Sequence, residues 1–164
     1  MSHCAPVRVL FVCLGNICRS PLAEGVFQAA IDKQGLSDRF KIDSAGTGAW
    51  HAGQAPDRRM RKTALSHGIQ LDDLRARQFT VADLGGFDHI YAMDAHNLND
   101  MLSLDRDTAF GSRVSLFRDL DPEPGDGQVP DPYYGGTDGF EEGFRIVDRT
   151  CEALRLELAK EYAL

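Results

Sequence analysis

The chain has 164 residues, which is enough for one domain with a buried core. Its composition of 43% hydrophobic and 26% charged residues is typical of a folded globular protein and argues against disorder. The formal net charge of −7 disfavours a nucleic-acid partner, because binding to phosphate backbones rests on clustered lysine and arginine. An anionic ligand would therefore need a local positive site.

The cysteines and the N-terminal sequence indicate where the protein works. None of the four cysteines (Cys4, Cys13, Cys18 and Cys151) forms a CxxC pair or lies at zinc-ligand spacing, so we expect no metal and no other cofactor. The apolar run over residues 9–14 is too short for a signal peptide or a membrane span. We therefore predict a cytoplasmic protein with no membrane partner.

Short apolar runs alternate with helical patterns along the chain. The β-branched run over residues 7–13 predicts a buried parallel strand, and Pro21 opens a helical pattern that Gly35 closes. In chain order, the remaining predicted elements are a strand over 40–44, a helix over 57–67, a strand over 88–93, a helix over 95–104, a strand over 113–117, a loop over 118–137 and an amphipathic helix over 140–158.

This alternation predicts a three-layer α/β sandwich, with a four-stranded, mostly parallel sheet and helices on both faces. No repeat, low-complexity tract or linker divides the sequence, so we expect a single domain over residues 1–164. Ligands bind to such sheets beyond the carboxyl ends of the strands. Residues 14–20 follow the first strand and lie at such an end, so we expect the site there.

The sequence VCLGNICRSP over residues 12–21 has the composition of an anion-binding loop. The turn directs successive backbone N–H groups inward, and the start of a helix adds partial positive charge. Arg19 offers a planar fork that matches two phosphate oxygens. The same field favours a nucleophilic thiolate on Cys13, to which Ser20 can donate a hydrogen bond. Because the lysine motif of nucleotide-binding loops is missing from this segment, a phosphate monoester fits better than a nucleotide.

The C-x5-R-S pattern, in this ten-residue form at a strand–helix junction, resembles the signature of the low-molecular-weight protein tyrosine phosphatases. The resemblance continues in the family order through DSAGT (43–47), SHG (66–68), ARQ (76–78), MD (93–94) and DPYYG (131–135). It implies the flavodoxin-like fold of the phosphotyrosine phosphatase I type. It also implies a metal-independent enzyme that hydrolyses phosphotyrosine and small aryl phosphates through a phosphocysteine intermediate.

The resemblance assigns catalytic roles and partners. It implies that Cys13 is the nucleophile and Arg19 the phosphate clamp, within a phosphate-binding loop completed by Leu14, Gly15, Asn16, Ile17, Cys18 and Ser20. Composition does not choose among the acidic residues of the loop over 118–137, but the DPYY motif points to Asp131 as general acid and then base. Phosphotyrosine-containing proteins are the implied substrates and inorganic phosphate or vanadate the implied inhibitors, and we expect a monomer.

Several other residues have both a functional and a plain structural interpretation. The family resemblance implies that Asn16 braces the loop in a network with Ser20, Ser44 and His67, although His67 is equally well explained as the end of a helix before Gly68. Asp94 could cap the helix that begins at residue 95, and the resemblance places it near the active site as well. The resemblance also places Trp50 at the rim of the pocket, where Tyr133 and Tyr134 could join it as walls around an aryl phosphate.

Two further features carry open alternatives. Cys18 could simply pack in the core, or it could form the reversible disulfide with Cys13 that the resemblance implies as protection from over-oxidation. Cys151 lies on the apolar stripe of the last helix and is expected in the core. The basic group Arg58, Arg59, Arg61 and Lys62 is expected to be a solvated helix face, with recruitment of acidic phosphoproteins as the alternative.

Three rival functions are compatible with the same scaffold. An arsenate reductase relays a disulfide through further cysteines, but residues 70–134 contain none. In related phosphoarginine phosphatases a threonine stands where this chain has Ile17, so Ile17 favours phosphotyrosine. A catalytically silent phosphate or phosphopeptide binder would be expected to lack Cys13 or Asp131, and both are present.

Overall fold

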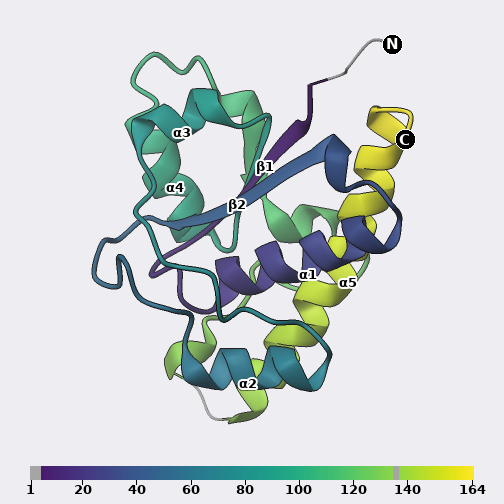
Figure 1. Cartoon of the computed structure of the whole chain (residues 1–164). Helices are drawn as coiled ribbons and strands as arrows, with labels where there is room; N and C mark the ends of the chain where they lie inside the picture. The colour runs from purple at the N-terminus through teal and green to yellow at the C-terminus, as the bar shows by residue number, and fades with distance from the viewer. Residues whose placement is uncertain (1–4, 135–136) are drawn as a thin grey trace.

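Four parallel strands form one sheet in the order β2-β1-β3-β4 (Figure 1). The computed structural model describes residues 5–134 and 137–164, with the side chains of Tyr134 and Thr137 outside that description. The strands are β1 (Val7–Cys13), β2 (Phe40–Gly46), β3 (His89–Ala92) and β4 (Val114–Leu116). The chain moves to one side of β1 for β2 and to the other side for β3, so the topological switch point lies at the carboxyl end of β1.

Helices cover both faces of this sheet, which confirms the predicted α/β sandwich with a flavodoxin-like layout. The helices are α1 (Arg19–Lys33), α2 (Arg58–Ser66), α3 (Val81–Gly86), α4 (Ala95–Leu104) and α5 (Thr137–Glu161). In Figure 1, α1 and α5 lie on one face and α3 and α4 on the other, while α2 lies beside the start of α5. None of the helices in the described ranges is both long enough and apolar enough to cross a bilayer.

The side chains of β1 alternate between two buried cores. Val9 and Phe11 belong to the core beneath α1 and α5, where the Phe11 ring lies 5.4 Å from that of Phe117. Leu10 and Val12 belong to the second core, beneath α3 and α4. Because both faces of β1 are covered, its residues 9–13 form a continuous apolar run, as expected for a central parallel strand.

The structure differs from the predicted elements in three places. Helix α1 begins at Arg19, so Pro21 occupies its third position, where a backbone N–H would still have no helical partner. Helix α3 was not predicted, because its six residues include two glycines; a capping box between Thr80 and Asp83 supports it. The segment predicted as a loop over 118–137 contains two short 3₁₀ turns, Phe117–Leu120 and Pro132–Tyr134.

Candidate active site

The loop between β1 and α1 is folded against the end of β2. Asn16 adopts a left-handed conformation with φ of 56°, which turns the chain back toward the strand. The N–H groups of Thr47 and Gly48 donate to the carbonyls of Cys13 and Leu14, both at 2.9 Å. A side chain at Gly46 would lie 2.7 Å from the carbonyl oxygen of Leu14, so this close approach requires glycine.

The side chain of Asn16 holds the loop through three hydrogen bonds. Its Nδ2 donates to Ser20 Oγ at 2.7 Å and to Ser44 Oγ at 3.0 Å, and its Oδ1 accepts from the N–H of Arg77 at 3.0 Å. Ser44 Oγ in turn donates to Glu24 Oε1 at 2.6 Å. The structure thus brings Asn16, Ser20 and Ser44 together in one buried network that braces the loop.

His67 lies outside this network, which corrects the prediction that it takes part. Its ring stacks on Phe144 of α5 at 3.9 Å between centroids, and its Nε2 lies 2.7 Å from Glu141 Oε1. Helix α2 ends at this point, before Gly68 with φ of 82°, and α2 packs against α5. Ser44, which we expected to share a network with His67, donates to Glu24 instead.

Glu24 is a member of the network that sequence reasoning missed. It lies on α1, and its carboxyl is largely enclosed between that helix and β2. Burial raises the pKa of Glu24 to about 7, with Asp43 adding to this effect and the Ser44 hydroxyl and Arg77 opposing it. The sequence carried no signal for this role, because a single glutamate in a helical pattern is ordinarily solvated.

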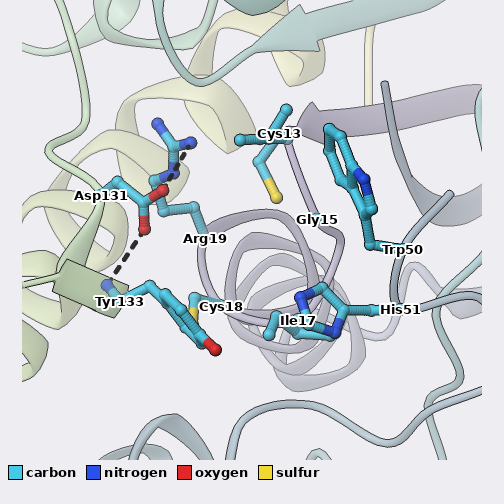
Figure 2. A pocket seen from close by; sticks show the side chains of 10 residues that line it. Cys13, Gly15, Ile17, Cys18, Arg19, Trp50, His51, Asp131 and Tyr133 are labelled. Atoms are coloured by element: carbon cyan, nitrogen blue, oxygen red, sulfur yellow. Dashed lines mark hydrogen bonds and ion pairs between the residues drawn. The ribbon is translucent and has the colours of Figure 1, made fainter. Parts of the chain in front are cut away.

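The sulfur of Cys13 points into a pocket at the carboxyl end of β1 (Figure 2). The residue is 2% exposed. Its Sγ lies 3.0 Å from Ser20 Oγ and accepts a hydrogen bond from the N–H of Asn16 at 3.3 Å. The sulfur thus has two polar partners and lies beside the N-terminus of α1.

The guanidinium of Arg19 forms a buried wall of the same pocket, with its side chain 4% exposed. Its Nη1 donates to Asp94 Oδ2 at 2.6 Å and to the carbonyl of Val129 at 3.1 Å, and its Nη2 lies 3.5 Å from Asp131 Oδ2. Burial by itself would lower the pKa of Arg19, but Cys13 and the two carboxylates outweigh burial and raise it. Arg19 is therefore a fixed cation whose orientation is set by its neighbours.

Asp94 and Asp131 each hold Arg19 and also shape their own backbone. Asp94 Oδ1 accepts from the N–H of Asn97 at 2.8 Å, so Asp94 both caps α4 and orients the arginine. Asp131 Oδ1 accepts from the N–H of Tyr133 at 3.0 Å, which closes the turn at the start of Pro132–Tyr134. Each carboxylate thus has one oxygen on the backbone and the other toward the guanidinium.

The pocket is a cavity of about 310 Å³ that is open on one side. It is lined by Cys13, Leu14, Gly15, Ile17, Cys18, Arg19, Trp50, His51, Asp131 and Tyr133. Within the described part of the chain, the backbone N–H groups of Gly15, Ile17 and Cys18 donate to no other residue. An anion in the pocket can therefore bind free N–H donors, the guanidinium and the N-terminus of α1 together.

Aromatic side chains form the mouth of the pocket. Trp50 is 71% exposed and Tyr133 is 39% exposed, and in Figure 2 they lie on opposite sides of the Cys13 sulfur. His51 was not predicted; its ring lies 6.1 Å from that of Tyr133, and its adjacency to Trp50 was the only signal in the sequence. The Tyr134 side chain, which was also expected at the rim, lies outside the described residues.

The remaining cysteines differ in environment. Cys18 lies in the pocket wall, and burial, reinforced by Asp57 and Cys13, raises its pKa well above the ordinary value. Cys151 lies in the core beneath α1 and α5, as expected. Cys13, Cys18 and Cys151 are unpaired, and Cys4 lies outside the described residues. In the ranges that the structure covers, no three His, Cys, Asp or Glu side chains are grouped so as to hold a metal ion.

The chain is similar to known proteins in both sequence and structure. Residues 8–164 match the family model described as low molecular weight phosphotyrosine protein phosphatase. The Schizosaccharomyces pombe enzyme of that name is 48% identical over 87% of this chain and 91% of its own length, and the human enzyme is 38% identical over 93% and 96%. The crystal structure of YfkJ from Bacillus subtilis superposes with a TM-score of 0.91 at 39% identity, covering 98% of this chain and 99% of that one.

Proposed function

Because the chain belongs to the low molecular weight phosphotyrosine protein phosphatase family, whose members are cysteine-based and need no metal ion, we propose that it hydrolyses phosphotyrosine in proteins through a phosphocysteine on Cys13. One observation carries this proposal. The sulfur of Cys13 lies at the base of a pocket whose walls hold Arg19 and Asp131 and whose mouth is aromatic. Nucleophile, phosphate clamp and proton donor therefore converge on one cavity.

In the first step, the Cys13 thiolate attacks phosphorus and the bond from phosphorus to the tyrosyl oxygen breaks. Hydrogen bonds from the Ser20 hydroxyl and the Asn16 N–H stabilise the attacking sulfur. Arg19 and the free loop amides bind the equatorial oxygens, which carry charge in the transition state. Asp131 donates its proton to the departing tyrosyl oxygen, so the product leaves as a phenol.

In the second step, water attacks the phosphorus of phosphocysteine and the phosphorus–sulfur bond breaks. Asp131, now a carboxylate, accepts a proton from that water, and inorganic phosphate and the Cys13 thiolate are released. Arg19 again stabilises the equatorial oxygens, in the role that Mg²⁺ takes in other phosphoryl-transfer enzymes. Inorganic phosphate and vanadate bind the same donors and are therefore expected inhibitors.

The mouth of the pocket supports an aromatic substrate. Trp50 and Tyr133 present ring surfaces on either side of the cavity, and Ile17 adds an apolar contact in the wall. A phosphotyrosine ring would fit between them, whereas a charged phosphoarginine would lose solvation against Ile17. We also propose that the whole chain forms one catalytic domain, since a single sheet carries both cores. We further propose that the protein acts as a monomer in the cytoplasm.

Substitution of the nucleophile tests the proposal. The wild-type protein should hydrolyse 4-nitrophenyl phosphate in excess EDTA and be inhibited by vanadate. Cys13→Ser should lower turnover by about 10⁴-fold or more, because serine is not ionised at neutral pH, while phosphate binding measured by calorimetry remains. Ordinary turnover by Cys13→Ser, or an activity that EDTA abolishes, would refute the assignment.

A further inference from the structure

Arg59, in the first turn of α2, joins three parts of the active site without lining the pocket itself. Its guanidinium pairs with Asp57, the residue that caps α2. Asp57 Oδ1 accepts from the N–H and the Nε of Arg59, at 2.8 and 3.2 Å, and its Oδ2 accepts from Nη2 at 3.1 Å. This is a two-pronged ion pair within one turn, which fixes the direction of the guanidinium.

Asp57 connects this pair to the phosphate-binding loop. Its backbone N–H donates to the carbonyl of Ile17 at 2.7 Å, and Ile17 lines the pocket. The start of α2 is therefore attached to the loop that carries Cys13. The same guanidinium that pairs with Asp57 also reaches Tyr133, in the chain segment that carries the proposed proton donor.

The guanidinium is also close to two aromatic rings. Its Cζ is 4.7 Å from the centroid of Phe140, which is buried at the start of α5, and 5.5 Å from that of Tyr133. Nη2 also donates to the carbonyl of Tyr133 at 3.4 Å. The N–H of Tyr133 in turn donates to Asp131 Oδ1, as the dashed line in Figure 2 shows. Two hydrogen bonds thus link Arg59 to the carboxylate of Asp131: Tyr133 accepts one at its carbonyl and donates the other from its N–H.

We propose that Arg59 is a positioning residue for the general acid: it holds the turn Pro132–Tyr134 against α2, and through Tyr133 it sets the distance of Asp131 from the leaving oxygen. The inference rests on the proposed role of Asp131. It accounts for a contrast with Arg58, which is next to Arg59 on the same helix, equally charged and likewise exposed, yet has no side-chain hydrogen bond or ion pair within the described ranges. The expectation of a solvated basic face therefore holds for both side chains, and Arg59 differs in its contacts.

The expected signature is a loss that grows with the basicity of the leaving group. If the acid is displaced, it protonates the departing phenolate oxygen less effectively, but the attack of the Cys13 sulfur on phosphorus is not affected. We expect Arg59→Ala to lower kcat/KM for phenyl phosphate by about tenfold, a fraction of the 10²–10⁴-fold that a positioned acid supplies, and for 2,4-dinitrophenyl phosphate by less than about twofold. Arg58→Ala is the matched control and should change neither value.

Two further variants separate positioning from folding and from substrate binding. Arg59→Lys keeps the charge near the rings but not the fork to Asp57, so it should recover part of the phenyl phosphate activity; thermal unfolding of each variant checks that the fold persists. In an Asp131→Ala background, Arg59→Ala should have no further effect on either substrate, because the acid it positions is gone.

Each outcome has one interpretation. An equal loss on both substrates, or an effect of Arg59→Ala that adds to that of Asp131→Ala, would overturn the positioning role and place Arg59 in phosphate binding. Identical kinetics for Arg59→Ala and Arg58→Ala would overturn it as well. If Asp131→Ala alone shows no dependence on the leaving group, the acid assignment in the proposed function fails, and this result is distinct from a failure of Arg59.

Discussion

Asp131 lies in the wall of the pocket, and its position suits two opposite proton transfers. One oxygen faces Arg19 at 3.5 Å, while the side chain remains 28% exposed and in contact with solvent. A carboxyl in this position can reach the oxygen that joins the tyrosyl ring to phosphorus. It can later reach a water that enters from the open side. The two steps of the proposed reaction need this combination of confinement and access to water.

Removal of this carboxyl should therefore affect substrates selectively. We expect Asp131→Ala to lower kcat/KM for phosphotyrosine by about 10²–10⁴-fold, because the phenol must then leave without a proton. For 2,4-dinitrophenyl phosphate, whose leaving group is stable as an anion, the loss should be less than about tenfold. The measurement is a plot of log kcat/KM against leaving-group basicity, and parallel lines for wild type and variant would point to another acid.

Cys18 is the second cysteine in the wall of the pocket, and its environment predicts how it would respond to oxidation. Peroxide should convert the Cys13 thiolate to a sulfenic acid, and the Cys18 thiol should then displace water from it to form a disulfide. Because burial raises the pKa of Cys18, closure should be slow at neutral pH and faster as pH rises. Peptide mass spectrometry after mild peroxide should find Cys13 linked to Cys18, with activity restored by dithiothreitol. In a Cys18→Ser variant the sulfenic acid has no thiol partner, so further peroxide should oxidise it to a sulfinic acid that dithiothreitol does not reduce. Equal recovery of the variant and the wild type after prolonged peroxide would contradict the protective role.

At the residue scale, Cys13 and Arg19 could be predicted from the sequence, but the residues around them could not. Cys13 and Arg19 occur in a motif whose residue types indicate the chemistry. Glu24 and His51 do not, because nothing local distinguishes a glutamate in a helix or a histidine in a turn until the fold places them beside Ser44 and Gly15. His67 was expected in the network, but its stacking on α5 was not visible from the local sequence.

At the scale of elements, the order β1, loop, α1 could be predicted from a buried apolar run that ends where glycine and asparagine begin. Long periodic segments such as α5 were also predictable, since an apolar stripe that repeats at helical spacing over several turns rarely occurs outside an amphipathic helix. Short elements were not. Helix α3 depends on its capping box and the two 3₁₀ turns pack against α5, and neither feature appears as periodicity in the sequence.

The contact between α1 and β2 should make the stability of the protein depend on pH through Glu24. Its carboxyl has a pKa of about 7 in the folded state and an ordinary value when unfolded. Its favourable contribution to the free energy of unfolding is therefore complete below about pH 4.5 and is lost as pH rises through 7. Glu24→Gln cannot ionise. Relative to that variant, the wild type should lose up to about 3 kcal/mol of unfolding free energy between acidic and alkaline pH.

Denaturant unfolding of both proteins near pH 4 and near pH 8.5 measures this difference directly. Other titrating groups cancel in the comparison, because the two proteins share them. A free-energy difference between wild type and Glu24→Gln that is the same at both pH values would show that Glu24 ionises normally in the folded protein.

At the scale of the whole molecule, the fold explains how an acidic protein binds an anion. The chain as a whole has a net charge of −7, whereas the pocket gathers a buried guanidinium, free N–H groups and a helix N-terminus at the carboxyl end of the central strand. The alternation of strands and helices predicted this sheet and the edge where the site lies. It could not predict that the turn with Asp131 is held from α2, because that contact joins segments that are 74 residues apart.

The proposed mechanism depends most on a covalent bond between phosphorus and the sulfur of Cys13. The direct measurement is rapid quench of the enzyme during turnover of a phosphotyrosine peptide, followed by mass spectrometry of the digest. We predict one phosphoryl group on the peptide that contains Cys13, formed at least as fast as steady-state turnover and missing in Cys13→Ser. A label on another residue, or full turnover with no labelled enzyme under conditions that preserve phosphocysteine, would contradict the mechanism.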